Sequence, residues 1–396
     1  MKMIHVVGDS KWGGGGTIIL ALADMARGLG WEVDFLTTDP ICRQMAAAHG
    51  LGIIDLDVIW RDIRPLRDLR GLYRLYRFFK THRYQLVHTH TSKAGVVGRI
   101  AARLAGVPAV LHTAHAFPFH EESGFPSRTI YRLIETFAGY FCDRIVTVSN
   151  YHRQWGLQLR IAKPSRLIAI PNGVSESNVA VRKIPSRVRA ELGIAPEDWF
   201  LFTPGRLSEG KGLEYLIDAI PQLVRMTVKR FTLVLAGDGP LRTALERKAA
   251  DSGYPDRIRF VGFRRDIGDL LNASDIVVLP SLHEGLSISL LEAMAVGKPI
   301  VATAIGGNLE PTGNGSAAMI VTPKDAAALA EAIITLINNP ALAIEKGNKA
   351  RELYLRHHTL ERMVDGYRRV YQDLALNAHA PRPLRDEHAV VSGNRL

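Results

Sequence analysis

Residues 283–295, HEGLSISLLEAMA, follow the short apolar run Ile276–Leu279 and lead into a helical pattern. Glu284 falls in the loop, and Glu292, eight residues later, falls within the helix near its start. Ionised carboxylates accept paired hydroxyl hydrogen bonds, and the amides of Gly285, Leu286, Ser287 and Ile288 at a helix N-terminus suit phosphate or sugar hydroxyls. The spacing alone is equally compatible with capping and surface glutamates. The stretch predicts a strand, a ligand-facing loop and a helix.

Similar units extend in both directions, because short β-branched apolar runs alternate with helical patterns along the chain. This alternation predicts an α/β fold with parallel sheets, in which ligands bind at the carboxyl ends of the strands. The strands of a first series are predicted at Met3–Val7, Glu32–Leu36, Leu86–His88, Ala109–Leu111, Ile145–Val148 and Leu167–Ile170. Those of a second series are predicted at Phe200–Thr203, Thr232–Ala236, Ile258–Val261, Ile276–Leu279, Ile300–Thr303 and Ala318–Val321.

A turn signal at Pro171-Asn172-Gly173 and a Pro-containing connection over Lys183–Ile194 separate the two series. We therefore predict two doubly wound domains, 1–185 and 195–358, facing each other across a cleft. A last helix, 359–376, is predicted to return to the first domain, and 377–396 is predicted to be a flexible tail.

Length and composition agree with two globular domains. The chain has 396 residues, of which 47% are hydrophobic and 22% charged, so disordered and membrane-spanning classes are disfavoured. Cys42 and Cys142 lack metal-ligand spacing, and the first apolar run is too short for a signal peptide, so we expect a cytoplasmic protein. The net charge is +11: residues 1–200 carry 26 Lys+Arg against 17 Asp+Glu, or +9, which leaves +2 for the rest.

Two glycine-rich loops follow predicted strands. Gly13-Gly14-Gly15-Gly16 opens the first helix without forming a G-x-G-x-x-G dinucleotide motif, and it is interpreted as a ligand-contacting loop, with a flexible turn as the alternative. GRLSEGKG, residues 205–212, carries Arg206 and Lys211. A guanidinium and an ammonium in one loop suit a diphosphate, although for this loop taken alone two solvated cations are the better explanation.

The motifs together resemble the retaining nucleotide-sugar glycosyltransferases of family four, which have the GT-B fold of two Rossmann-like domains. Glu284 and Glu292 match the E-x7-E motif of that family. HTSKAG and HTAHAFPF are similar to bacterial members that assemble exopolysaccharide, capsule or O-antigen units on a polyprenyl diphosphate. The other matching segments stand in the expected order: 88–95, 112–115, 170–174, 205–212, 236–240, 261–263 and 297–299.

The resemblance implies a role for each matching residue. Arg206 and Lys211 would neutralise the donor diphosphate, Glu292 would bind the ribose, and Glu284 would bind the transferred sugar with help from the amides near Gly285–Ser287. His115 would lie near the reaction centre, with a buried core imidazole as the alternative, whereas His88 and His90 are better explained as core residues. Donor contacts are also implied for Gly14, Gly15, Gly16, Gly237, Leu286, Ile288 and, through its backbone, Phe263.

Three departures from the family pattern are Ala116, Ser287 and the segment Asn308-Leu309-Glu310, and we expect them to affect sugar and phosphate contacts rather than the fold. The resemblance implies retention of anomeric configuration. No residue is nominated as a nucleophile, so we favour front-face substitution. With Arg206 and Lys211 in place of a cation, and no Asp-x-Asp pair near these motifs, we expect no metal and no cofactor beyond the nucleotide-sugar co-substrate, a UDP-sugar.

The residues 60–83 contain eight Lys+Arg and two acids. Apolar Leu66, Leu69, Leu72, Tyr73, Tyr76 and Phe79 recur at helical spacing, while Arg67, Arg70, Arg74, Arg77 and Lys80 fall mainly on other faces. This pattern is typical of a helix that binds an anionic membrane surface, and the lipid-linked glycan acceptor that the resemblance implies favours that interpretation; the alternative is a solvated surface helix. We therefore expect the protein to be peripheral on the inner face of the cell membrane.

Several other functions remain as alternatives. A glycosyltransferase with a soluble small-molecule acceptor, or a sugar-nucleotide epimerase or phosphorylase, would use the same fold. Nucleic-acid binding is disfavoured because the basic stretch lacks a recognised motif, and an NAD-dependent oxidoreductase is disfavoured because the dinucleotide fingerprint is absent.

Overall fold

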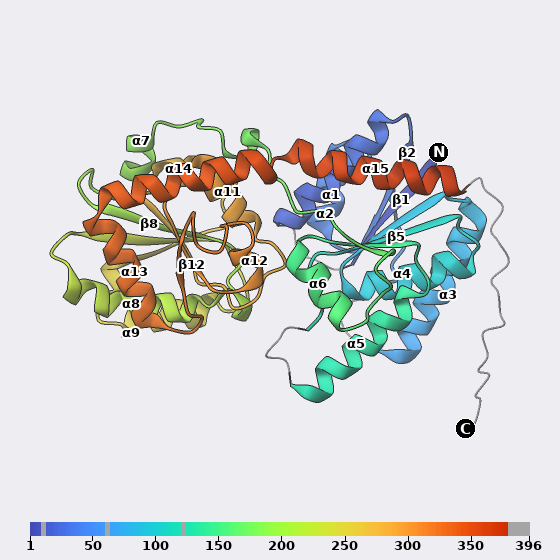
Figure 1. Ribbon diagram of the computed structural model, residues 1–396, viewed down its shortest axis with the longest axis horizontal. Coiled ribbons are helices and arrows are strands. Elements are labelled where there is room, and N and C mark those ends of the chain that lie inside the picture. The colour runs from blue at the N-terminus through green and yellow to red at the C-terminus, as the bar shows by residue number, and fades with distance from the viewer. Residues whose placement is uncertain (9–12, 60–63, 120–123, 379–396) are drawn as a thin grey trace, which may run out of the picture.

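A computed structural model describes residues 1–8, 13–59, 64–119 and 124–378, which form two α/β lobes side by side (Figure 1). The first lobe contains a parallel sheet with the strand order β3-β2-β1-β4-β5-β6-β7, and the second contains a parallel sheet with the order β10-β9-β8-β11-β12-β13. The predicted fold class, two Rossmann-like domains of the GT-B type, is confirmed.

In the first lobe the strands are β1 Lys2–Val7, β2 Glu32–Thr37, β3 Gly52–Ile54, β4 Leu86–His90, β5 Ala109–Ala114, β6 Arg144–Thr147 and β7 Leu167–Ala169. The helices are α1 Gly14–Gly28, α2 Pro40–Ala48, α3 Pro65–His82, α4 Ser92–Leu104, α5 Phe125–Gly139 and α6 Asn150–Gln158. Most central strands are buried along their whole length, because helices cover both faces of the sheet.

In the second lobe the strands are β8 Trp199–Pro204, β9 Phe231–Ala236, β10 Ile258–Gly262, β11 Ile276–Leu279, β12 Ile300–Thr303 and β13 Met319–Val321. The helices are α7 Pro185–Glu191, α8 Leu213–Met226, α9 Arg242–Asp251, α10 Ile267–Ala273, α11 Ile288–Val296, α12 Gly306–Leu309, α13 Ala326–Asn338 and α14 Pro340–His357, and a last helix, α15 Leu360–Ala378, follows them and returns to the first lobe. Short 3₁₀ turns lie at Glu176–Val179, Glu209–Lys211 and Pro255–Arg257.

Both sheets reverse their strand order at one point, between β1 and β4 in the first and between β8 and β11 in the second. Loops separate at such a switch point, and ligands of doubly wound proteins bind there, beyond the carboxyl ends of the strands. The glycine-rich segment that begins α1 and the loops after β8 and β11 all follow strands at these two points. The topology therefore predicts that a ligand binds at the boundary between the lobes.

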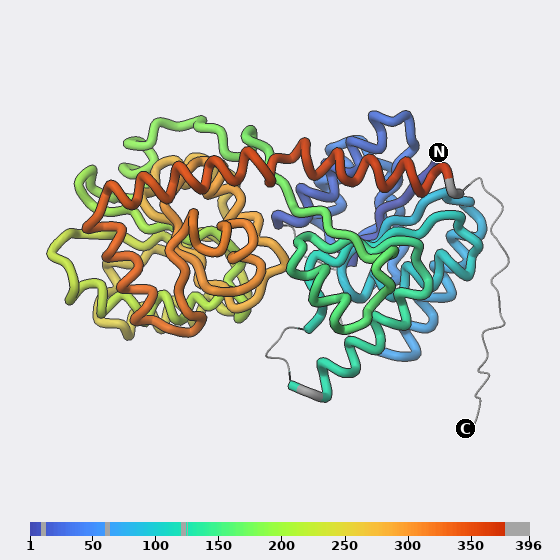
Figure 2. Tube along the Cα trace, viewed as in Figure 1, coloured from blue at the N-terminus to red at the C-terminus, as the bar shows by residue number. Residues whose placement is uncertain are grey.

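The chain passes between the lobes twice, and the two passes pair with each other (Figure 2). Val174 N donates to His358 O at 3.0 Å, and Leu360 N donates to Val174 O at 3.0 Å. The helix α15 then packs on the first lobe, where Met363, Tyr367 and Tyr371 are buried against its sheet. The last helix thus completes the core of the first lobe. The predicted tail lies mostly outside the described residues, which end at 378.

Two further features bear on the expected location. Cys42 and Cys142 are both buried, and they form no disulfide with each other. Among the described helices, none is by itself both long and apolar enough to cross a bilayer; only the bent pair α13 and α14 satisfies that length and composition test together.

Candidate active site

The centre of the candidate site is an ion pair between Lys211 and Glu284. Lys211 Nζ donates to Glu284 Oε1, and Ser281 Oγ donates to the same oxygen at 3.1 Å. The other oxygen, Glu284 Oε2, has no hydrogen-bond partner among the residues that the structure describes. The two predicted residues therefore converge, with one carboxylate oxygen still able to accept a hydroxyl hydrogen bond.

Close backbone contacts bring the glycine-rich loop to this carboxylate. Leu282 N donates to Gly210 O at 2.8 Å, and a Cβ added to Gly212, which has φ +58°, would lie 2.2 Å from Pro280 O. A Cβ on Gly237 would lie 1.8 Å from Gly205 O. Only glycine permits these approaches. In the structure Gly237 thus packs the loop after β9 onto the loop after β8, and its donor contact remains a prediction.

Arg206 lies in the same loop and is partly buried. Its Nε atom is buried without a hydrogen-bond partner, and no described carboxylate forms an ion pair with its guanidinium. A guanidinium left in this state is suited to bidentate binding of a phosphate group. Arg206 and Lys211 together therefore offer two cations from one loop.

The second glutamate of the motif, Glu292, lies on α11 and is partly buried. Its carboxylate has no hydrogen-bond or ion-pair partner in the described part of the chain. Burial raises the pKa of Glu292 to about 7. An isolated buried carboxylate is stabilised by hydroxyl donors, which is the chemistry that a ribose would supply.

The first lobe meets this region through His115 and Gly14. A Cβ on Gly285 would lie 1.7 Å from His115 O, so the backbone of the residue after Glu284 directly contacts the first lobe. A Cβ on Gly14 would lie 2.7 Å from the side chain of Ile288. His115 is partly buried, and burial lowers its pKa to about 4. The predicted proximity of His115 to the glutamate loop is therefore present across the lobe boundary.

The remaining predicted donor contacts lie at the ends of neighbouring elements. Ser287 is the N-cap of α11 and accepts from Leu290 N at 3.4 Å. Leu286 is buried, and Gly15 is open, with nothing within 4 Å of an added Cβ. Phe263, in the loop after β10, is 61% exposed. The ligand contacts of these residues, and that of Gly16, remain predictions.

The departure at residues 308–310 has a structural role, contrary to the expectation that it affects only ligand contacts. Glu310 accepts from Asn150 N at 2.9 Å, Asn150 Nδ2 at 3.0 Å and Tyr151 N at 2.7 Å. A carboxylate from the second lobe thus caps α6 of the first lobe. Asn308 is buried and donates to Thr303 O at 3.0 Å. Glu310 thus links the two lobes, whereas Asn308 bonds within the second lobe.

The helix α3 only partly matches its predicted pattern. Leu75 and Phe79 are buried, whereas Leu66, Leu69 and Tyr73 are exposed, Leu66 by 87%. The helix packs on the first lobe through Leu75 and Phe79, while Leu66, Leu69 and Tyr73 face solvent, and the predicted membrane contact of this helix stays a prediction. Trp60 and residues 61–63 of the basic stretch lie outside the described residues. The predicted cations are all exposed: Arg67, Arg70, Arg74, Arg77 and Lys80.

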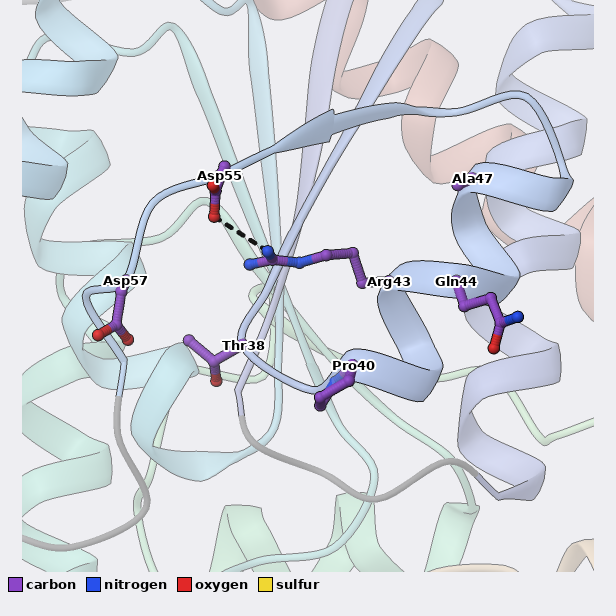
Figure 3. A pocket seen from close by; sticks show the side chains of 7 residues that line it. All are labelled: Thr38, Pro40, Arg43, Gln44, Ala47, Asp55 and Asp57. Atoms are coloured by element: carbon purple, nitrogen blue, oxygen red, sulfur yellow. Dashed lines mark hydrogen bonds and ion pairs between the residues drawn. The ribbon is translucent and has the colours of Figure 1, made fainter.

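Sequence reasoning missed a hollow of about 480 Å³ beside α2, at the carboxyl ends of β2 and β3 (Figure 3). Arg43 Nη1 donates to Asp55 Oδ1 at 2.9 Å, and Asp57 and Thr38 lie on the same side. Carboxylates, a guanidinium and a hydroxyl are groups that bind sugar hydroxyls. No sequence signal separates these side chains from ordinary solvated loop residues.

The fold and the site together define the class of protein. Two doubly wound lobes, a glycine-rich loop with two cations, and one glutamate in the loop after β11 with a second on α11 are the features of a GT-B glycosyltransferase. Family models agree: residues 12–178 match Glycosyltransferase Family 4, and residues 186–353 match Glycosyl transferases group 1.

Individual proteins support the same assignment. The UDP-Gal:alpha-D-GlcNAc-diphosphoundecaprenol alpha-1,3-galactosyltransferase of Escherichia coli is 30% identical over 75% of this chain and 78% of its own length. The putative glycosyltransferase EpsD of Bacillus subtilis is 30% identical over 74% and 78%. Anabaena HepE in complex with UDP-glucose has the same fold, with TM-score 0.81, 23% identity, and coverage of 94% of this chain and 100% of that one. The chain belongs to the glycosyltransferases of family four.

Proposed function

We propose that the protein transfers a sugar from a UDP-sugar to a glycan linked to a polyprenyl diphosphate, with retention of anomeric configuration, in the synthesis of a cell-surface polysaccharide. The observation that carries the proposal is that one glycine-rich loop brings Lys211 to the Glu284 carboxylate and leaves the Arg206 guanidinium without a carboxylate partner among the described residues. Two relatives favour these substrates: the E. coli protein is named for UDP-Gal and a diphosphoundecaprenol-linked acceptor, and HepE was solved with UDP-glucose.

The donor's diphosphate would lie on the glycine-rich loop. Arg206 would bind it bidentately, and Lys211 would contact it while remaining near Glu284, so negative charge on the leaving UDP is stabilised as the glycosidic bond breaks. Glu292 would accept the ribose hydroxyls. Glu284 Oε2 would accept a hydroxyl of the transferred sugar, since Oε1 already accepts from Lys211 and Ser281.

The reaction would be a front-face substitution. The acceptor hydroxyl attacks the anomeric carbon on the side from which UDP departs, and a leaving phosphate oxygen takes its proton. No partnered carboxylate is then required as a nucleophile, which agrees with the engagement of Glu284 by Lys211. Arg206 and Lys211 would supply the positive charge that a metal ion supplies elsewhere, so we propose a metal-independent enzyme.

A transfer assay tests this function. UDP- and GDP-sugars are incubated with polyprenyl-diphosphate-linked sugars in EDTA, and the product linkage is determined by NMR. We expect turnover with a UDP-sugar, undiminished by EDTA, and a product with the donor's anomeric configuration. Inversion, dependence on Mn²⁺ or Mg²⁺, or transfer only to soluble small molecules would contradict the corresponding part of the proposal. Stabilisation by NAD alone in a thermal-shift screen would contradict all of it.

We also propose that the first lobe docks on the membrane that holds the acceptor, on its inner face. Support comes from α3, which exposes Leu66, Leu69 and Tyr73 next to arginines, and from α5, which exposes an apolar stripe. The helix α4 packs between these two helices. Exposed apolar side chains interspersed with cations are the composition of an interfacial membrane surface. The stripe on α5 consists of Ile130, Leu133, Ile134 and Phe137, followed by Tyr140.

Charge reversal on α3 tests the docking. The Arg67/Arg70/Arg74/Arg77→Glu variant is expected to lose flotation with vesicles containing anionic lipid, because each cation near such a surface contributes about 1 kcal/mol. The matched control reverses four exposed arginines elsewhere, Arg225/Arg230/Arg247/Arg362→Glu, and should float like the wild type. Equal flotation of wild type and the α3 variant would refute the role of this helix.

A further inference from the structure

Three imidazoles form a hydrogen-bonded line from the core of the first lobe to the lobe boundary. His5 lies on β1, His90 ends β4, and His115 follows β5. His5 Nδ1 is 3.0 Å from His90 Nε2, and His90 Nδ1 is 3.2 Å from His115 Nε2. His5 and His90 are fully buried, and His115 is partly exposed. The line therefore ends on the one histidine of the three that a ligand can reach.

These rings are neutral near pH 7. Burial lowers the pKa of His5 to about 3 and that of His115 to about 4, and it holds the pKa of His90 well below its ordinary value. A neutral imidazole has one N–H and one lone pair. Each ring in the line must then donate through one nitrogen and accept through the other. Both hydrogen bonds consequently run in the same direction.

The inner end of the line favours one direction. His5 Nε2 is buried and has no hydrogen-bond partner among the residues that the structure describes. If the N–H groups pointed inward, this nitrogen would carry a buried hydrogen without an acceptor, and orphaned buried N–H groups are rarer in proteins than orphaned acceptors. If they point outward, His5 Nε2 holds only a lone pair. His5 Nδ1–H then donates to His90, and His90 Nδ1–H donates to His115.

We propose that His90, supported by His5, is a positioning residue that holds His115 in the Nδ1–H tautomer. The lone pair of His115 Nε2 is used by His90, so the ring presents an N–H donor from Nδ1, which has no partner among the described residues. The residue that meets the glutamate loop is thereby fixed as a hydrogen-bond donor, able to bind a hydroxyl or phosphate oxygen. The catalytic part of this inference rests on the proposed function; the tautomer does not.

A metal ion is the competing explanation, because ligand nitrogens of His5, His88 and His90 lie within 4.8 Å of one another. Both nitrogens of His88 are already bonded, Nδ1 to the Tyr371 hydroxyl at 2.7 Å and Nε2 to Thr113 Oγ1 at 2.8 Å. Both nitrogens of His90 are also bonded, as described above. A metal would have to displace these hydrogen bonds, so the relay accounts for the cluster better.

Nitrogen-15 NMR of histidine-labelled protein reads the tautomers without any substrate. We expect His115, assigned by loss of its signal in His115→Gln, to be Nδ1–H in the wild type. His112 is an internal reference, because its Nδ1 lies 3.0 Å from Thr89 Oγ1 and 3.2 Å from Thr89 O, two contacts that substitutions at His90 do not remove, so its tautomer should be the same in every variant. An Nε2–H tautomer at His115, or stoichiometric metal in the purified protein, overturns the proposal.

Two variants then separate positioning from simple structure. His90→Asn keeps an N–H donor where Nδ1 lies, and His90→Leu removes it. We expect His90→Leu to change the His115 tautomer and to lower kcat by roughly 10- to 100-fold, as for other residues that orient a functional imidazole, with little change in donor KM. His90→Asn should retain most of the wild-type kcat and the wild-type tautomer of His115. Equal activity of the two variants at matched Tm would overturn the role of His90 in catalysis. The NMR result does not depend on whether the enzyme uses a UDP-sugar, so it tests the tautomer separately from the proposed function.

Discussion

Replacement of Lys211 by alanine is expected to lower kcat by roughly 10²–10³-fold, the usual effect of removing one preorganised donor from a developing negative charge. Lys211 Nζ is already held at the site by Glu284 Oε1, so no rearrangement is needed when UDP begins to leave. Donor KM should rise less than kcat falls, because charge on the leaving phosphate is greatest in the transition state. Steady-state kinetics with a saturating acceptor measure both constants.

Two controls make this result specific. Lys248→Ala removes a lysine that pairs with Asp218 at 2.7 Å on the surface of the second lobe, and it should leave kcat unchanged. Lys211→Ala removes a cation and also leaves the Glu284 carboxylate without its partner. A double-mutant cycle that combines Lys211→Ala with Glu284→Gln separates these two effects. If Lys211→Ala keeps activity within about threefold of the wild type while Arg206→Ala does the same, the diphosphate does not bind on this loop.

The sequence is sufficient to predict most of the fold because the strands are buried on both faces. Such strands read as continuous apolar runs, and every predicted strand is present, with ends displaced by at most three residues. β3, Gly52–Ile54, was missed because three residues carry too little pattern. The sequence leaves open whether a membrane or the sheet covers the apolar residues of α3, since periodicity identifies an apolar stripe without saying which neighbour covers it; in the structure Leu66, Leu69 and Tyr73 are exposed.

The site could be predicted only where one segment holds its residues. Two short motifs contain the predicted residues: one holds Glu284 and Glu292, and the other holds Arg206 and Lys211. The structure brings Glu284 to a loop that adjoins the loop of Arg206 and Lys211. The histidine line joins residues from β1, from β4 and from the segment directly after β5, so it depends on strand adjacency and register, which no local pattern contains. His88 and His90 are core residues as expected, yet His90 also reaches His115. The pKa of Glu292 likewise depends on what surrounds it.

The substitution Glu292→Gln is expected to raise the stability of the free protein above pH 7 and to weaken donor binding. Burial raises the pKa of Glu292 to about 7 from an ordinary 4.5, so the folded protein holds this proton more tightly than the unfolded chain does. Stability contributed by this group therefore falls as pH rises from about 4.5 to 7, and the full penalty, up to about 3 kcal/mol, is present above that range. Glutamine carries no charge, so Glu292→Gln should have the higher Tm at pH 8 and no advantage at pH 4.5.

Donor binding should depend on pH in the opposite direction to stability, because the donor is bound better when Glu292 is ionised. The ionised carboxylate accepts from two hydroxyls, and protonation removes one acceptor, so the affinity of the wild type for a UDP-sugar should fall between pH 8 and pH 6. Glu292→Gln should weaken binding roughly 10- to 100-fold at pH 8 and show a flat profile, since hydrogen bonds to a charged group are lost. Calorimetry with an intact UDP-sugar avoids the titration of free UDP. The exposed Glu331→Gln serves as control.

A wild-type pH profile of donor affinity as flat as that of Glu292→Gln would mean that the ribose lies elsewhere. A gain in Tm together with lost affinity would identify Glu292 as a residue retained for binding at the expense of stability.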